Sequence, residues 1–191
     1  MVDVDGVVVA SPPGGWAATM EADLGLPVAV LQEHFFARHW DDVALGRAGL
    51  HERLAPVLER HAPHLSCERL TAYWFAKDAN LDHQLLADLA ALRATGVELH
   101  LATVQEHLRA DYLWTTLAFR DRFDAMHYAA DLGAKKPDPA FFARIAERTG
   151  FRPAEMTLLD DRPDNVEAAR AAGWGGLHWT GRERLADLLG R

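Results

Sequence analysis

The chain has 191 residues, which fits one domain of ordinary size or a core domain that carries a small insertion. Its 49% hydrophobic and 25% charged content is that of a soluble globular protein, and no apolar stretch approaches the ~20 residues that span a bilayer. The formal net charge of −8 argues against a nucleic-acid surface, because phosphate backbones bind to clusters of Lys and Arg, so we expect neither a membrane nor a nucleic-acid partner.

The first ten residues predict a buried strand. Met1–Ala10 is rich in β-branched valine, and the apolar run stops at the turn-forming segment Ser11–Gly15. Asp3, Asp5 and Gly6 interrupt the run. Carboxylates are costly to bury without partners, so we expect both to project into a polar cleft.

Residues 14–92 predict a small helical bundle. Apolar residues recur there at three- and four-residue spacing, and Gly, Pro, Asp or Ser separate the periodic segments. The expected helices are Val28–His39, Leu50–His61, Glu68–Ala76 and His83–Ala94.

After Gly96 the pattern changes to alternating strands and helices. Asp138 and Pro139 mark a helix start, since Asp caps free amides and Pro suits the first turn. The expected strands are Val97–Ala102, Ala125–Ala129, Met156–Leu159 and Gly176–His178. The expected helices are Glu106–Leu117, Pro139–Thr149, Pro163–Ala172 and Glu183–Leu189.

This alternation is typical of a parallel sheet with helices on both faces. The N-terminal strand must join that later sheet, so the middle helices form an insertion. We therefore predict an α/β fold with a Rossmann-like three-layer parallel-sheet core, residues 1–13 and 93–191, and a small inserted α-helical cap domain, residues 14–92.

Polar residues follow several of the expected strands. In open α/β sheets, ligands bind beyond the carboxyl ends of the strands, so these residues should converge on one crevice. The set supplies carboxylates, a hydroxyl and a fixed cation, an inventory suited to phosphoryl transfer. Its members are Asp3, Asp5, Thr103, Lys136, Asp160 and Asp161.

The segments that hold these residues are DVDGV, LATVQEH, LGAKKPDPAFF and LLDDRPDNVEAARAAG, in that order along the chain. With them the chain resembles the haloacid dehalogenase superfamily, in the phosphatase-like branch that carries a helical cap after the first motif. The four motifs and the cap segment together extend the resemblance over essentially the whole chain.

The resemblance implies separate roles for the two N-terminal carboxylates. Asp3 would be the nucleophile that becomes an aspartyl-phosphate, and Asp5 would protonate the leaving oxygen and later help to activate water. Lys136 would neutralise the phosphoryl oxygens. Lys135 competes for that role, but the family pattern places the lysine directly before Pro137.

The resemblance also implies a magnesium site. Asp161 would bind Mg²⁺ together with Asp3 and the main-chain carbonyl of Asp5, and Asp160 would be a neighbouring or alternative ligand. Cys67 is the only cysteine, which excludes an intramolecular disulfide and a Cys/His cluster and agrees with oxygen ligands. By itself, the Asp160–Asp161 pair is more typical of a helix start than of a metal site.

Phosphate and substrate contacts are expected from Thr103, from the main-chain amide of Val104, and from Lys136. Val104 departs from the family pattern, which often has Asn there. Arg47 in the expected cap is a candidate for binding a substrate anion, although a solvated arginine is the simpler interpretation.

These residues predict a Mg²⁺-dependent hydrolase of a small phosphomonoester that acts through an aspartyl-phosphate. A phosphomutase or a haloacid dehalogenase of the same superfamily is an alternative, as is a catalytically idle binding or regulatory module. The first residues lack the pattern of a secretory signal, so we expect a cytoplasmic protein that acts on a small phosphorylated metabolite. The sequence specifies neither that metabolite nor the oligomeric state.

Overall fold

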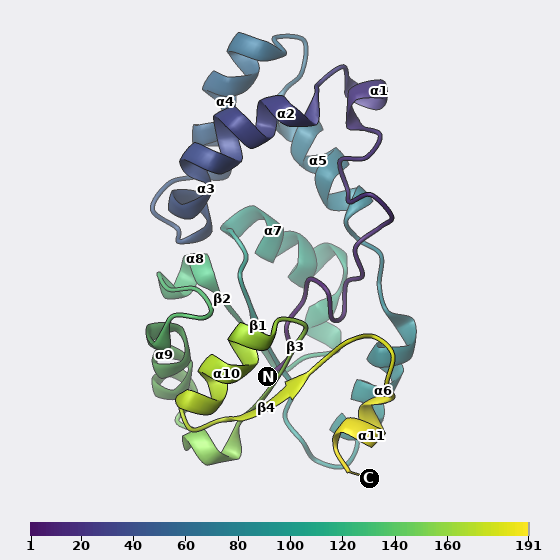
Figure 1. The fold of residues 1–191 in the computed structure, drawn as a ribbon, viewed down its shortest axis with the longest axis vertical. Helices are drawn as coiled ribbons and strands as arrows, with labels where there is room; N and C mark the ends of the chain where they lie inside the picture. Colours follow the sequence, from purple (N-terminus) through teal and green to yellow (C-terminus); the bar gives the residue numbers. More distant parts are fainter. Residues whose placement is uncertain (191) are drawn as a thin grey trace.

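A computed structural model describes residues 1–190 and contains a parallel sheet flanked by helices, with further helices above it (Figure 1). Strand β1 (His100–Thr103) pairs in parallel with β2 (Ala125–Tyr128), with Ala102 opposite His127. Strand β3 (Thr157–Asp160) pairs in parallel with β4 (Gly175–His178). The predicted α/β class with a Rossmann-like core is confirmed.

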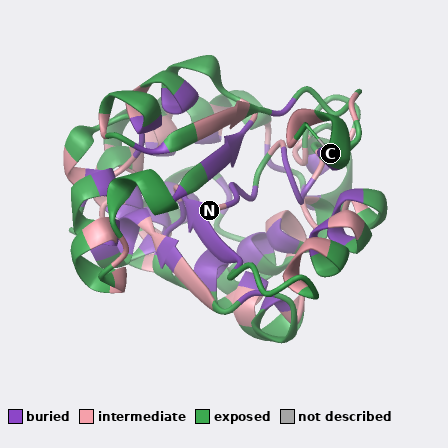
Figure 2. Ribbon diagram, turned by 90° about the horizontal axis from the view of Figure 1, so that it is seen from below, coloured by how far each residue is buried: buried purple, intermediate pink, exposed green. Residues whose placement is uncertain are grey.

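The N-terminal residues join the two strand pairs into one sheet. The amide of Val2 donates to the carbonyl of His100 (2.8 Å) on one side, and the amide of Asp3 donates to the carbonyl of Leu159 (2.9 Å) on the other. Because Val2 pairs in parallel with both β1 and β3, the order across the sheet is β2, β1, residues 1–3, β3, β4. The inner strands β1 and β3 are mostly buried, whereas the outer strands β2 and β4 are more exposed; Figure 2 shows the buried strands at the centre of the fold with helices around them.

The predicted strand Met1–Ala10 is wrong beyond Asp3. The chain turns back there, with the amides of Gly6 and Val7 donating to the carbonyls of Val9 (2.8 Å) and Val4 (3.2 Å). Gly6 has a φ of +80°, which ends an extended strand and is readily adopted only by glycine. The valines around it are buried all the same, because the turn packs into the core.

The core helices follow the strands in alternation. Among them, α9 (Pro139–Thr149) has the predicted bounds, and Asp138 caps it by accepting the amide of Ala140 at 2.8 Å. The expected helix Glu106–Leu117 divides into α7 (His107–Asp111) and a π-helix, η2 (Tyr112–Thr116). The others are α8 (Ala129–Leu132), η3 (Phe119–Asp121), η4 (Pro153–Glu155), α10 (Pro163–Ala171) and α11 (Leu185–Leu188).

The helices above the sheet have a buried cluster of their own, which includes Met20, Phe35, Leu54 and Leu70. They are α1 (Met20–Leu24), α2 (Val28–Leu31), η1 (Gln32–Phe36), α3 (Ala37–Ala44), α4 (Leu50–His61) and α5 (Cys67–Lys77). We call this group the upper helices. Among residues 1–190, every helix is too short or too polar to cross a membrane.

Helix α6 (His83–Arg93) packs with the sheet rather than with the upper helices. Its residues Leu85, Leu86 and Leu89 lie in the same buried cluster as Val2 and Leu101. The expected cap range, residues 14–92, therefore contains a helix whose apolar face belongs to the sheet. The division into core and cap at these residue numbers stays a prediction.

Two adjacent strands bury a pair of histidines. His100 on β1 and His127 on β2 are 7% and 3% exposed, and His100 Nδ1 lies 3.0 Å from His127 Nε2. Burial, and next the neighbouring His100, lowers the pKa of His127 to about 4. His127 is therefore neutral in the folded protein over a pH range in which an unfolded histidine gains a proton.

This arrangement predicts acid destabilisation that depends on His127. Below a pH of about 6.5 the unfolded state binds a proton that the folded state does not, so the free energy of unfolding falls by roughly 3 kcal/mol in total as the pH drops towards 4. Urea unfolding between pH 7 and pH 4 measures this slope. His127→Gln should flatten it, whereas His83→Gln, which replaces an exposed histidine, should not. An unchanged slope in His127→Gln would contradict the assignment.

Candidate functional site

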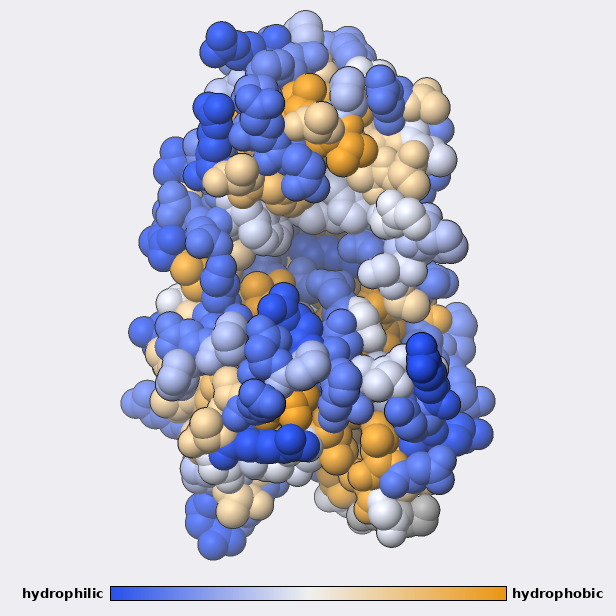
Figure 3. Space-filling view, viewed as in Figure 1, coloured by the Kyte–Doolittle hydropathy of each residue, from blue (hydrophilic) through white to orange (hydrophobic). Residues whose placement is uncertain are grey.

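A cavity of about 500 Å³ opens at the carboxyl ends of the strands. Figure 3 shows the recess between the upper helices and the core, with hydrophilic residues at its floor. Most of the predicted site residues meet here, although they come from segments far apart in the sequence. The lining residues are Asp3, Asp5, Gly6, Ser11, Thr103, Val104, Lys135, Lys136, Pro137, Asp161, Arg162 and Asn165.

Lys136 lies between two carboxylates at the base of this cavity. Its Nζ is 2.9 Å from Asp3 Oδ1 and donates to Asp160 Oδ2 at 2.5 Å, and the residue is only 5% exposed. The amide of Val4 also donates to Asp3 Oδ1, at 2.8 Å. Both contacts hold the same oxygen of Asp3, so its Oδ2 is left to meet a ligand.

Asp160 is fully buried behind the cavity and is occupied by protein donors. Its Oδ1 accepts the side-chain amide of Asn165 (3.0 Å) and the main-chain amide of Arg162 (2.9 Å), while Oδ2 accepts Lys136. The carboxylate therefore joins the end of β3 to the start of α10 and to Lys136. Asn165, which the sequence placed in the same motif, takes part through Asp160.

The oxygen atoms fit a divalent cation. Asp3, Asp160 and Asp161 each offer a carboxylate oxygen, and these atoms lie within 4.8 Å of one another. Burial raises the pKa of Asp3 to about 7; Lys136 opposes this and Asp160 adds to it. Burial and then Asp160 raise the pKa of Asp161. A cation among these acids would favour their charged forms, and all-oxygen ligation suits Mg²⁺.

The carboxylate of Asp5 lies apart from this group of three. Its Oδ2 accepts a hydrogen bond from Gln105 Nε2 at 2.6 Å. Although Asp5 is exposed to the cavity, the protein atoms around it raise its pKa through desolvation, against the opposing charge of Arg109. The two N-terminal aspartates, two residues apart, thus have different partners and different surroundings.

Thr103 is buried at the end of β1, and Val104 follows it at the rim of the cavity. Arg47 is not brought to the site: it is absent from the lining, and its Nε donates to Asp42 Oδ1 at 2.8 Å on the exposed surface. Lys135 does line the cavity, and its Nζ reaches Asp41 Oδ1 of α3 at 2.5 Å. This ion pair joins the upper helices to the core.

Two polar residues of this region, Gln105 and Arg109, were not predicted from the sequence to belong to the site. Gln105 stands two residues after Thr103 in the LATVQEH segment, near a strand end. That position indicates a residue close to the site but does not indicate which side chain it contacts. Arg109 is 3% exposed; its guanidinium donates to the carbonyl of Phe75 (2.9 Å) and lies over the rings of Phe75 and Tyr112. It fixes the end of α5 against α7.

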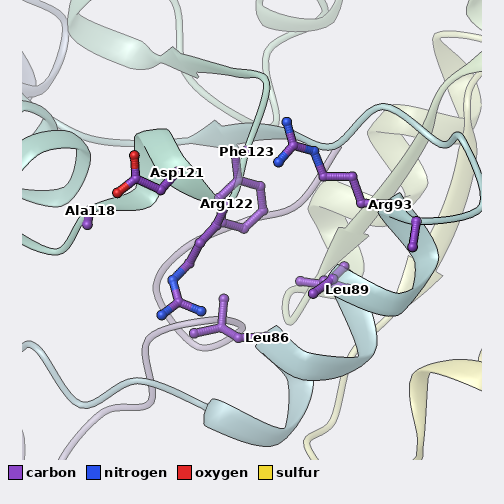
Figure 4. Close-up of a pocket in the computed structure, with 9 residues that line it drawn as sticks. Leu86, Leu89, Arg93, Ala118, Asp121, Arg122 and Phe123 are labelled. Atoms are coloured by element: carbon purple, nitrogen blue, oxygen red, sulfur yellow. The ribbon is translucent and has the colours of Figure 1, made fainter.

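A larger hollow, about 680 Å³, lies between α6 and η3 (Figure 4). It is lined by Leu86, Leu89 and Phe123 together with Arg93 and Arg122, and Arg93 pairs with Asp124. It lacks the convergent carboxylates that the strand-end cavity has. Chemistry rather than volume therefore selects the smaller cavity as the candidate site.

Comparison with known proteins decides the family. The model of haloacid dehalogenase-like hydrolases matches residues 1–173. The chain belongs to this family. It is also 30% identical to the phosphoglycolate phosphatase of Yersinia pseudotuberculosis, in a match that covers 90% of this chain and 75% of that protein. A shorter match, 39% identical over 57 residues, covers 23% of flavin mononucleotide hydrolase 1 of Arabidopsis thaliana and 30% of this chain.

Solved structures show that the family fold extends over the chain. A HAD family enzyme of Bacteroides thetaiotaomicron, solved in complex with magnesium and inorganic phosphate, superposes with a TM-score of 0.82 at 18% identity. The superposition covers 98% of this chain and 96% of that one. A dehalogenase is similar at a TM-score of 0.65 and 14% identity, over 95% of this chain and 84% of that one.

Gly6 sets the approach of the N-terminal turn to Asp161, and its replacement tests this contact. A Cβ at Gly6 would lie 2.4 Å from Asp161 Oδ2, whereas one at Gly15, which has a similar φ of +79°, would meet nothing within 4 Å. Gly15→Ala should cost about 1 kcal/mol of unfolding free energy through backbone strain alone. Gly6→Ala should cost roughly 1–3 kcal/mol more, because Asp161 must move.

Urea unfolding of the two variants measures this difference. Mg²⁺ should raise the melting temperature of the parent and of Gly15→Ala but have little effect on Gly6→Ala, since a displaced Asp161 no longer completes the group of carboxylates. Equal stability losses and equal Mg²⁺ responses in the two variants would contradict a close contact between Gly6 and Asp161.

Proposed function

We propose that this protein is a Mg²⁺-dependent hydrolase of a small phosphomonoester that acts through an aspartyl-phosphate on Asp3. The proposal depends on one observation: Asp3 and Asp5, two residues apart, have different hydrogen-bond and ion-pair partners. Asp3 Oδ1 is held 2.9 Å from Lys136 Nζ, among the acids that suit a cation, while Asp5 stands apart on Gln105. Nucleophilic attack needs an anion and leaving-group protonation needs an acid, so separate surroundings suit the pair.

In the first step, Asp3 Oδ2 attacks phosphorus, a bond forms between them, and the bond from phosphorus to the leaving oxygen breaks. Asp5 gives its proton to that oxygen, and its raised pKa favours the protonated form required. In the second step, Asp5 takes a proton from water as the water oxygen attacks phosphorus. The bond to Asp3 Oδ2 then breaks and releases phosphate.

The cavity supplies electrostatic support for both steps. The ammonium of Lys136 faces Asp3 and would offset the charge of the phosphoryl oxygens, and the hydroxyl of Thr103 and the amide of Val104 would donate to them. Mg²⁺, held by Asp3 and Asp161 with the main-chain carbonyl of Asp5, would supply further positive charge when bound. Asp160 would act mainly as the anchor of Lys136. Arg47 would have to leave Asp42 to reach a substrate.

The relatives support a small phosphorylated substrate. They are named phosphoglycolate phosphatase, sesquiterpene phosphatase and flavin mononucleotide hydrolase, and the match covers 50% and 23% of the last two proteins. The predicted cap at residues 14–92 would enclose the leaving group and exclude bulk water. The presence of Asp5 favours phosphoester hydrolysis over dehalogenation, which has no leaving oxygen to protonate.

The nucleophile is tested with a panel of phosphomonoesters assayed for phosphate release. Asp3→Asn should lower kcat by at least about 10³-fold, because the amide is not a nucleophile. Asp187→Asn, which changes an exposed aspartate in α11, is the matched control and should keep parent activity. Parent-level turnover by Asp3→Asn would refute the assignment. Halide release from a 2-haloacid with no phosphatase activity would favour the dehalogenase alternative.

Removal of the metal gives an independent test. Dialysis against EDTA should abolish phosphate release, and added Mg²⁺ should restore it, because three crowded carboxylates beside one ammonium disfavour binding of an anionic substrate. Ca²⁺ should restore much less activity, since it prefers more ligands at longer distances. Full turnover in EDTA would refute the metal dependence. It would not affect the role of Asp3, which the Asp3→Asn variant tests separately.

A further inference from the structure

Gln105 has a buried side chain, and the family resemblance assigned no role to it. It is 4% exposed, and its Nε2 lies 2.6 Å from Asp5 Oδ2 and 3.4 Å from Thr103 Oγ1. A side-chain amide carries two N–H donors, and these two oxygens receive both of them. The amide therefore links the proposed acid to the hydroxyl proposed to contact the phosphate.

The main chain around Gln105 is fixed on both sides. The carbonyl of Gln105 accepts the amide of Ala130 at 3.1 Å, which anchors it to the start of α8. The next residue, Glu106, caps α7 by accepting the amides of Leu108 (2.8 Å) and Arg109 (2.5 Å). With its backbone held by two helices, Gln105 presents its amide from a rigid base.

Asp5 depends on this amide for its direction. In the part of the chain that the structure describes, Gln105 is the only side chain that hydrogen-bonds the carboxylate of Asp5. Asp5 is otherwise exposed to the cavity that it lines. One buried donor therefore determines where a solvent-facing carboxyl group points.

We propose that Gln105 is a positioning residue that aims the carboxyl group of Asp5 at the leaving oxygen. The inference rests on the proposed function and adds a residue to it. Its consequence is selective in the first step, because there the aim of Asp5 affects the transfer of a proton to the leaving oxygen, whereas the second step is the same for every ester. Alkyl phosphates, whose alkoxide leaves poorly, need the proton, whereas p-nitrophenyl phosphate has a leaving group that departs without it.

The test compares the rate of the first step on these two kinds of ester, measured as alcohol or p-nitrophenol released in the first turnover. Gln105→Met keeps a side chain of similar length but removes the donors. It should lower the first-turnover rate about 10- to 100-fold on the best alkyl phosphate of the panel and less than about 3-fold on p-nitrophenyl phosphate, with substrate affinity little changed. Gln84→Met is the matched control, since it removes a Gln–Asp hydrogen bond, from Gln84 to Asp88 at 3.0 Å, on the exposed face of α6.

Asp5→Asn should show the same dependence on leaving group, and Gln105→Met should add little in that background, because both changes remove one function. Equal losses of the first-turnover rate on both esters, or full additivity with Asp5→Asn, would overturn the positioning role. If Gln105→Met melts well below the parent, Gln105→Glu, which keeps the shape, is measured by the same criteria. A parent that hydrolyses neither ester would overturn the proposed function itself.

Discussion

The site depends on a buried ammonium between two buried carboxylates. Lys136 Nζ touches Asp3 Oδ1 and Asp160 Oδ2, and the side chain of Lys136 is almost completely shielded from solvent. A charge in such a place is unfavourable unless it is paired, so the three side chains require one another. They come from the N-terminal segment, the loop before α9, and the end of β3. If one of these segments moved away while the core around the others stayed closed, an unpaired buried charge would remain.

The central sheet brings those segments together. Only residues 1–3 fill the position between β1 and β3, yet hydrogen bonds on both sides hold them in register. Asp3 ends this short extended piece, and the turn at Gly6 then directs Asp5 away from the acids around Lys136. The separation of the two carboxylates is therefore a product of backbone geometry over three residues.

The upper helices meet the core through a few specific contacts. Arg109 holds the end of α5, Lys135 pairs with Asp41 of α3, and Gly46 passes so near Ala130 that a Cβ would lie 2.3 Å from its carbonyl oxygen. Within residues 1–190, the lining of the cavity comes from residues outside the range 14–92. The core alone thus supplies the groups proposed for chemistry, and the same loops that carry them also hold the upper helices.

The family and the α/β class could be predicted from the sequence, as could most of the residues that line the candidate site, because these follow from local patterns and ordered motifs. The bounds of α4 and α9 were predictable for the same reason: periodic apolar residues stand between clear start and stop signals. The hydrogen-bond and ion-pair partners of these side chains, in contrast, depend on the tertiary structure. Gln105 meets Asp5 across 100 positions, Asp160 holds Lys136 across 24, and Arg47 pairs with Asp42 instead of reaching the cavity. Periodicity reports which face of an element is buried, whereas the contact of one polar atom with another depends on how separate elements pack.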